Sequence, residues 1–454
     1  MAIAVPAPTV GAPSRVRSYA KHVLWIMFAI NFLNYMDRFI LPSVLSSIQK
    51  EFRISDFQAG LLATAFTLVY AVAALPFGIW ADRGIRKNVV ATGVGLWSLA
   101  TLMTGAAGSF FSLFISRAAV GVGEAGYYPA GTSLLVDYFP KEKRAWMLGV
   151  WNVGASIGVA FGFAIGGLIA DHLGWRWAFY FTVIPGAICT ILAFRIREPR
   201  RGCGDVLSPS MDGPIPELAE RPVHAEVPAP PFMTAVRQIL TVPTMRVALI
   251  AQTMNFFVLG AAVLWFPTLL QRRFEMSQSK AGLISGAVLV LAGIIGTLGG
   301  GWLADRLLPR IPSARLLVTG WAFIISAPLL VVSLLANSLA VLIPLFFLAG
   351  ICLQAYHGPM SALMQDVVTP RLRAVAVAVS LIVAHVLGDA ASPSLVGALS
   401  DSIGSGHKDT LGQHLGTALQ FTLPPMILAA GIVCFLGLRY VKQDTDAAEQ
   451  PMAV

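Results

Sequence analysis

The stretch Gly78-Ile-Trp-Ala-Asp82-Arg83 recurs later in the chain as Gly301-Trp-Leu-Ala-Asp305-Arg306. Two other sets recur at nearly the same spacing: Asp137 with Arg144 recurs as Asp366 with Arg373, and Gly167, Asp171 and Gly174 recur as Gly397, Asp401 and Gly404. Three matches at nearly constant spacing indicate an internal duplication. The chain is therefore predicted to consist of two halves with one pattern.

The composition places these halves in a membrane. Of the 454 residues, 56% are hydrophobic and only 12% are charged, and the mean hydropathy is +0.72. Soluble domains are about 25% charged, so this chain cannot cover a water-facing globule with polar surface. We predict a polytopic membrane protein with lipid as its main partner. The net charge of +9 is not interpreted as nucleic-acid binding.

The apolar segments predict twelve transmembrane helices, because a helix needs about 20 residues to cross the hydrocarbon. The predicted spans are His22–Gln49, Asp56–Trp80, Asn88–Ser109, Phe111–Tyr138, Arg144–Ala170, Trp175–Phe194, Thr244–Leu270, Ser277–Ala304, Ala314–Ala336, Leu339–Gln365, Arg373–Leu399 and Leu411–Leu438. A proline-rich stretch between Arg195 and Pro231 is typical of a flexible linker and divides the spans six and six. The predicted fold is all-α, with a tail at 1–20, six-helix bundles at 21–196 and 241–441, a cytoplasmic linker at 197–240 and a tail at 442–454.

The distribution of Lys and Arg predicts the orientation. Basic residues gather on the side of both termini and of the linker, and cytoplasmic loops carry an excess of Lys and Arg. We expect both termini in the cytoplasm and, in a bacterium, insertion in the plasma membrane. The segment up to Ala20 shows no cleavable signal.

Two motifs carry a family resemblance. Gly78-x-x-x-Asp82-Arg83-x-x-Arg86-Lys87 resembles the signature loop of the major facilitator superfamily, and Asp171-His-Leu-Gly174-Trp-Arg176 at the corner of the fifth and sixth spans is also typical of it. The resemblance covers the chain except its tails and linker. It implies the major facilitator fold. The duplication by itself describes a transporter whose two parallel halves rock about a substrate site near the midplane, and we expect a monomer.

Three stretches are similar to spinster-like lipid transporters within that superfamily. They are Asn34-Tyr-Met-Asp37-Arg38, Arg117-Ala-Ala-Val-Gly121-Val-Gly-Glu124-Ala, and His385-Val-Leu-Gly388-Asp389-Ala-Ala-Ser392-Pro393. The sequence departs from the animal spinster proteins at two places. Gly126-Tyr127-Tyr128-Pro129 resembles the organic-anion branch of the superfamily instead, and Gly84-Ile85 also differs. The resemblance implies lysophospholipid or sphingolipid-like cargo.

Four charged residues lie inside apolar spans, where a charge costs about 2.5–3.5 kcal/mol and is normally paired and functional. They are Asp37 and Arg38 in the first span and Arg117 and Glu124 in the fourth. Neighbours on a helix point about 100° apart, and Arg117 and Glu124 are about 10.5 Å apart along one helix face. Arg117 and Glu124 are therefore expected to find partners on another helix, and the first span supplies both signs.

This arrangement suggests a proton-coupling device. Burial disfavours a charged carboxylate, and a nearby guanidinium favours it. We hypothesise that Asp37 and Glu124 exchange protons while Arg117 alternates between these carboxylates and an anionic headgroup. Arg38 is expected to support this polar centre by orienting the surroundings of Asp37 or the entrance. The alternative is a static buried network that only fixes helix registry.

The repeated loop motif predicts a gate. Asp82, Arg83, Asp305 and Arg306 are expected at the cytoplasmic membrane edge, where acid and base can pair across the ends of neighbouring helices. The resemblance implies that such loops latch the outward-open state. Plain positive-inside charge is the alternative and would suffice for Arg86 and Lys87.

Further polar and aromatic residues are candidates for the substrate cavity: Tyr128, Asn255, Phe256, Trp265, Tyr356, His357, His385 and Asp389. His385 and Asp389 are one helical turn apart and can share a face, either as a group that titrates near neutrality or as a plain hydrogen-bonded pair. A largely apolar, aromatic wall suits an amphiphile with a small charged head, although aromatic residues in membrane helices often serve packing alone.

The sequence argues against other classes of protein. It has no phosphate-binding loop, no metal-binding histidine pair and no nucleophile–base constellation, so we predict neither an enzyme, nor a metal site, nor an ATP-driven pump. The proton gradient is the expected energy source, with no cofactor. The predicted function is proton-coupled secondary transport of lysophospholipid or sphingolipid-like amphiphiles by alternating access. The alternative is proton-coupled symport of small organic anions.

Overall fold

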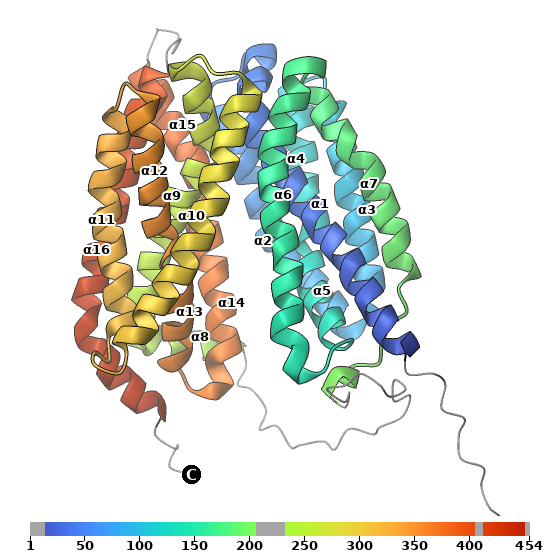
Figure 1. Ribbon diagram of the computed structural model, residues 1–454, viewed down its shortest axis with the longest axis vertical. Helices are drawn as coiled ribbons and strands as arrows, with labels where there is room; N and C mark the ends of the chain where they lie inside the picture. The colour runs from blue at the N-terminus through green and yellow to red at the C-terminus, as the bar shows by residue number, and fades with distance from the viewer. Residues whose placement is uncertain (1–13, 206–231, 405–411, 450–454) are drawn as a thin grey trace, which may run out of the picture.

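The computed structural model describes residues 14–205, 232–404 and 412–449. Within these ranges the regular structure is helical and no strand occurs, which confirms the predicted all-α class (Figure 1). Ten helices in the described part of the chain are long and apolar enough to cross a membrane.

The helices form two bundles, and the helices that correspond to the predicted spans follow in the same order in each bundle. The first contains α1 (Ser14–Phe52), α2 (Asp56–Arg83), α3 (Arg86–Gly105), α4 (Phe110–Ala125), α5 (Tyr127–Val136), α6 (Arg144–Leu173) and α7 (Trp175–Arg195). The second contains α9 (Pro243–Arg273), α10 (Gln278–Leu307), α11 (Ala314–Leu335), α12 (Leu339–Gln354), α13 (His357–Asp366), α14 (Arg373–Ala384), α15 (Ser392–Ile403) and α16 (Gln413–Glu449). Each of the twelve predicted spans corresponds to one helical segment or to a broken pair of helices.

Three predicted spans are interrupted. The fourth breaks into α4 and α5 at Gly126, and the tenth breaks into α12 and α13 at Ala355 and Tyr356. Gly126 and Ala355 are separated by the same interval as Asp137 and Asp366, so the break belongs to the duplicated pattern. The eleventh span carries a π-helical turn, His385–Asp389, between α14 and α15. Its counterpart in the first half, α6, is one continuous helix.

The predicted linker is divided between the bundles. Residues 197–205, which end in a short 3-10 turn at Cys203–Asp205, follow α7 and contact the first bundle. The amphipathic helix α8 (Phe232–Thr241) contacts α9 and α14 of the second bundle. Residues 206–231, the most proline-rich part of the predicted linker, lie outside the described residues.

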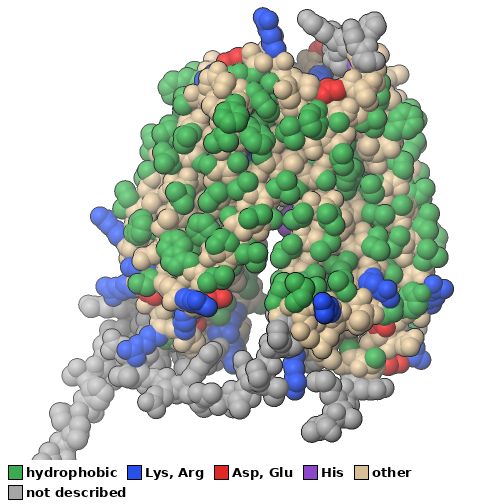
Figure 2. Space-filling view, turned by 180° about the vertical axis from the view of Figure 1, so that it is seen from behind, with side chains coloured by type: hydrophobic (Ala, Val, Ile, Leu, Met, Phe, Trp, Pro, Cys, Tyr) green, Lys and Arg blue, Asp and Glu red, His purple; other side chains and the backbone are tan. Residues whose placement is uncertain are grey.

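In the part of the chain that the structure describes, the two bundles meet at one end of the molecule. There α2 packs along α15, and α6 packs along α10. This end, which contains Phe52 and Asp56, is called the closed end below. The bundles diverge toward the opposite end, where α1 begins and α16 finishes (Figure 1), and Figure 2 shows the hollow between them there. This second end is called the open end.

The hydrophobic cores show the same asymmetry. One core cluster is built only from the first bundle and includes Met27, Trp97 and Trp151. The other contains the second bundle together with Ile40, Leu41, Val44, Leu45 and Ile48 of α1 and Ala59 and Leu62 of α2. Burial of apolar surface therefore joins the bundles at the closed end and leaves them separate toward the open end.

Candidate functional site

An ion pair between α1 and α4 forms the polar centre of the first bundle. Arg38 Nη2 lies 2.6 Å from Glu124 Oε2, and Arg38 Nε donates to the same oxygen at 3.2 Å. The Glu124 side chain is fully buried, whereas the Arg38 side chain is 27% exposed. The rings of Tyr35, Phe66 and Tyr70 surround the Arg38 guanidinium at 4.9–5.4 Å. Glu124 thus has its partner on the first span. A partner on another helix was expected, because Arg117 and Glu124 are too far apart along their own helix to bond.

Asp37 and Arg117 lie buried beside this pair but do not bond to it. Among the described residues, neither oxygen of Asp37 and neither Nε nor Nη1 of Arg117 has a hydrogen-bond partner. The Thr182 hydroxyl lies next to Asp37, but it donates to the Phe179 carbonyl at 2.9 Å. The Arg117 guanidinium faces the ring of Phe66 at 5.6 Å. Among the described residues no hydrogen bond or ion pair joins Arg117 to a carboxylate, and Glu124 is paired with Arg38 instead.

Arg38 supplies the cation of this polar centre. The prediction that Arg38 orients the surroundings of Asp37 or the entrance did not name a partner for it, and its side chain points to Glu124 on α4. The reason is the helix geometry: Asp37 and Arg38 are neighbours, so their side chains diverge by about 100° and reach different helices.

The second bundle has its own polar pair in the π-helical turn. His385 Nδ1 lies 2.9 Å from Asp389 Oδ2, so the two residues share a face. The second Asp389 oxygen, Oδ1, is buried without a hydrogen-bond partner in the described part of the chain. The Phe256 ring stands edge-on to His385 at 5.1 Å. Because π turns are rare and often occur at functional sites, this pair is the strongest polar candidate in the second bundle.

The other cavity candidates are scattered. Tyr356 is buried, with its ring 6.4 Å from that of Phe256, and the exposed His357 lies beside Gln354 with 3.0 Å between Nε2 and Oε1. Tyr128 is exposed in the first bundle and stacks on Trp151 at 5.0 Å.

Asn255 and Trp265 are fully buried. Asn255 Nδ2 donates to the Leu353 carbonyl at 3.4 Å, and Trp265 Nε1 donates to the Pro393 carbonyl at 3.0 Å. In this conformation neither side chain is exposed on a cavity surface, because both pack between helices. This corrects their assignment to the substrate cavity.

Comparison with known proteins decides the family. The sequence profile of the Major Facilitator Superfamily matches residues 27–393. The chain belongs to the major facilitator superfamily. It is 31% identical to Protein spinster of Drosophila melanogaster over 91% of this chain and 68% of that protein. It is also 31% identical to Protein spinster homolog 1 of Homo sapiens, over 94% of this chain and 82% of that protein.

Solved structures agree with this assignment. A bacterial homologue of the human lysosomal transporter Spinster, in an inward-facing and unoccupied conformation, matches with a TM-score of 0.78 and 26% identity, over 96% of this chain and 99% of that one. The nucleoside transporter NupG matches with a TM-score of 0.72 at 11% identity, which shows the shared fold. The protein is a spinster-like, multi-pass integral membrane transporter and not an enzyme.

The superfamily signature loop lies at the open end, and its ion pairs differ from those predicted. Asp82, Arg83, Asp305 and Arg306 are exposed. Arg306 lies over the Trp302 ring at 5.3 Å. In the described residues none of these four forms an ion pair across helix ends, because the bundles are apart at this end.

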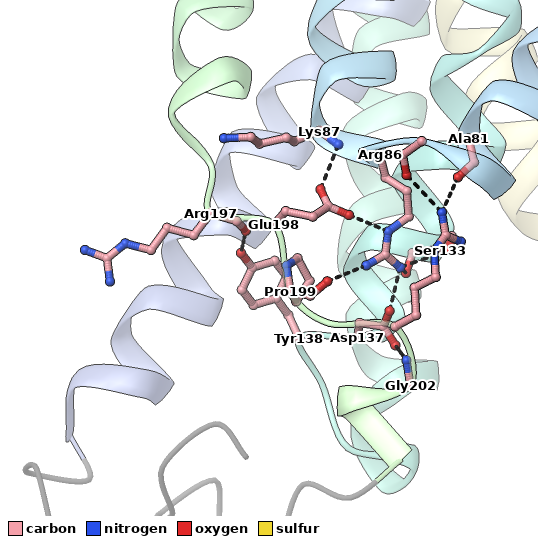
Figure 3. A network of polar contacts seen from close by, with 12 residues as sticks. Ala81, Arg86, Lys87, Ser133, Asp137, Tyr138, Arg197, Glu198, Pro199 and Gly202 are labelled. Atoms are coloured by element: carbon pink, nitrogen blue, oxygen red, sulfur yellow. Dashed lines mark hydrogen bonds and ion pairs between the residues drawn. The ribbon is translucent and has the colours of Figure 1, made fainter. Parts of the chain in front are cut away.

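Arg86 is the centre of the polar network in this loop (Figure 3). Its Nη1 lies 2.5 Å from Asp137 Oδ2, and its Nε lies 2.7 Å from Glu198 Oε1. The guanidinium also donates to the carbonyls of Ser133 and Pro199. Arg86 is 1% exposed and pairs with two carboxylates, so it has a structural role beyond the plain positive-inside charge that was the alternative for it.

The start of the linker completes this network. Gly202 N–H donates to Asp137 at 2.9 Å, Lys87 N–H donates to Glu198 at 3.0 Å, and Arg201 donates to the Ala81 carbonyl at 2.6 Å. Residues 197–205 thereby fasten the signature loop to α5 and α7 within the first bundle. The second half repeats the central pair as Arg315 with Asp366, which stand at the positions that the duplication gives for Arg86 and Asp137.

Replacing Arg86 by Ala is expected to lower the free energy of unfolding by about 3–5 kcal/mol, because it leaves the buried Asp137 carboxylate without its cation. Thermal unfolding of the detergent-solubilised transporter measures the effect. Arg83→Ala is the matched control, since that side chain is exposed. Equal melting of the two variants would show that the Arg86 network does not hold the loop.

The spinster-like transporter has a second ion-pair network, at the closed end, that the sequence did not indicate. Arg272 at the end of α9 reaches across the bundles to Asp56 at the start of α2, with 2.6 Å between Nη2 and Oδ1. Gln49 bonds both partners, and Ser400 donates to Asp56 Oδ2 at 2.7 Å. Arg272 and Asp56 are far apart in sequence, and no repeat or motif connects them.

Proposed function

We propose that this spinster-like protein is a proton-coupled secondary transporter that works by alternating access and moves lysophospholipid or sphingolipid-like amphiphiles. Asp37 and Glu124 would carry the proton, Arg117 would alternate between these acids and the anionic headgroup, and Arg38 would hold Glu124 in the conformation seen here. The proton gradient would be the energy source.

The observation that carries this proposal is the buried, incompletely paired charge of the first bundle. Asp37 and Arg117 are each 1% exposed and lack hydrogen bonds at the atoms named above. An unpaired buried charge is costly, so a protein retains it where protonation or a bound anion relieves the cost. Arg117 has the fixed charge and the forked geometry that suit a phosphate or carboxylate head.

An apolar cavity supports an amphiphilic substrate over a small anion. It lies in the second bundle, where α6 of the first bundle also contacts it, and its lining includes Phe163, Leu259, Phe266, Val288, Leu330 and Phe346. Ser285 and Gln354 are the polar members of this otherwise apolar lining, which suits a hydrocarbon chain better than a short carboxylate. The resemblance of three stretches to spinster-like lipid transporters implies the same kind of cargo.

The charge distribution supports an orientation. Lys and Arg gather around the open end on the face shown in Figure 2. Because basic residues favour the cytoplasmic side, we propose that the open end and both termini face the cytoplasm. The conformation would then be inward-facing, like that of the bacterial spinster homologue.

Transport into proteoliposomes tests the function. Purified protein is reconstituted, a pH gradient is imposed, and uptake of labelled lysophospholipids is compared with uptake of short mono- and dicarboxylates. We expect gradient-dependent movement of lysophospholipid and background movement of carboxylates. The reverse pattern would establish the organic-anion alternative. Lysolipid movement that ignores the gradient would remove proton coupling from the proposal.

A further inference from the structure

Two helices at the closed end have the same incomplete N-terminal cap. In α2, Ser55 Oγ accepts from Gln58 N–H, and the Ser55 carbonyl accepts from Ala59 N–H. In α10, Ser277 caps Lys280 and Ala281 in the same way. The first N–H groups of a helix have no partner within the helix. Each serine cap therefore leaves two backbone donors unsatisfied: those of Asp56 and Phe57 in α2, and those of Gln278 and Ser279 in α10.

The missing acceptors come from the opposite bundle. Asp401 on α15 accepts from Asp56 N–H at 3.0 Å and from Phe57 N–H at 2.9 Å, one bond to each carboxylate oxygen. Asp171 on α6 accepts from Gln278 N–H at 3.1 Å and from Ser279 N–H at 2.8 Å, again with one bond to each oxygen. Each bundle thus supplies one carboxylate to a helix N-terminus of the other bundle and has one of its own helix N-termini capped in return.

This reciprocity explains one of the repeats in the sequence. Asp171 and Asp401 are equivalent positions of the duplication, and the capped pairs 56–57 and 278–279 are separated by a similar interval. The repeated glycine one helical turn before each aspartate has a matching role. A Cβ at Gly397 would lie 2.3 Å from the Asp56 carbonyl oxygen, and a Cβ at Gly167 would lie 2.3 Å from the Gln278 carbonyl oxygen. The glycines let the helices approach, and the aspartates bond them.

We propose that Asp171 and Asp401 are positioning residues of the transport cycle, which latch the closed end as a reciprocal pair of caps between the bundles. A carboxylate at a helix N-terminus is favoured by the helix dipole as well as by its hydrogen bonds. Opening this end exchanges all four bonds for water. The two caps therefore contribute, with the Arg272–Asp56 network, to how often the closed end opens, whatever the substrate.

Alkylation of a buried cysteine measures that opening. Ser43 on α1 is fully buried, and its carbonyl accepts from Gln271 of the second bundle, so a thiol there reacts only when the bundles part. Ser43→Cys is introduced where the four native cysteines are replaced, and its reaction with a membrane-impermeant maleimide is timed in proteoliposomes. An N-cap is worth about 1 kcal/mol, so Asp171→Ala and Asp401→Ala should each raise the rate about fivefold. The double variant should raise it about 25-fold if the caps act independently.

Glu51→Gln is the matched control. Glu51 lies at the same end but bonds Arg176 and Trp175 within the first bundle, so its loss should leave the alkylation rate unchanged. An unchanged rate in the double aspartate variant, or an equal rise in Glu51→Gln, would overturn the latch. The assay needs neither substrate nor pH gradient. Failure of the proposed lipid transport would therefore leave the outcome for the latch unaffected.

Discussion

Asp37→Asn is expected to abolish transport driven by a pH gradient, with a loss of at least about tenfold, while substrate exchange without a gradient persists. Asn has the shape of Asp but cannot gain or lose a proton. Asp37 is 1% exposed and neither oxygen is hydrogen-bonded within the described structure, so the neutral amide also removes the cost of burying a charge there. The variant should fold at least as stably as the parent.

Uptake into proteoliposomes with and without the gradient measures this effect. Glu275→Gln is the matched control, because that carboxylate is exposed in the connection between α9 and α10. It should retain gradient-driven uptake. Gradient-driven uptake at the parental rate in Asp37→Asn would assign Asp37 to a static network, which is the alternative that its sequence context left open.

Gly167→Ala and Gly397→Ala are expected to hold the closed end apart. The added methyl group would lie 2.3 Å from a backbone carbonyl oxygen of the other bundle, and the next nearest atoms are also backbone. Backbone cannot turn aside as a flexible side chain can, and overpacking costs about 1–3 kcal/mol. The Ser43→Cys alkylation rate should therefore rise by about tenfold or more, with a corresponding loss of transport.

Gly299→Ala provides the control for this pair. A Cβ at Gly299, in the same helix as the capped end of α10, would meet no atom within 4 Å. Its alkylation rate should equal that of the parent. Parental rates in Gly167→Ala and Gly397→Ala would mean that the bundles pack more loosely at the closed end than the structure indicates.

Most of the architecture could be predicted because it depends on local composition. Long apolar segments, the proline-rich linker and the repeated motifs each report on a stretch of chain without reference to its neighbours. The breaks at Gly126 and Ala355 were not predicted, although each is followed by a proline, Pro129 or Pro359, that has no N–H to donate to the carbonyl four residues before it. At the first break the helices also pack closely: a Cβ at Gly126 would lie 2.3 Å from the Phe77 ring.

The sequence could predict which charged residues are candidates for the site, but not which of them form ion pairs with each other. A charge in an apolar span is visible in the sequence, and so Asp37, Arg38, Arg117 and Glu124 could be selected. The partner of Glu124 could not be chosen between Arg38 and other cations, because that depends on how α1 and α4 are rotated against each other. The same holds for Arg86, whose burial depends on Asp137 and Glu198 converging from α5 and the linker.

The sequence by itself determined that this protein is a duplicated, twelve-segment membrane transporter with charged groups in its first half, because hydropathy and repeats are properties of the chain. The tertiary structure decided which of these charges pair and where the bundles touch. Arg272 with Asp56, and the caps made by Asp171 and Asp401, join residues that are distant in the sequence. Such contacts exist only when the two bundles lie together in one orientation, and a single sequence carries no local signal of that orientation.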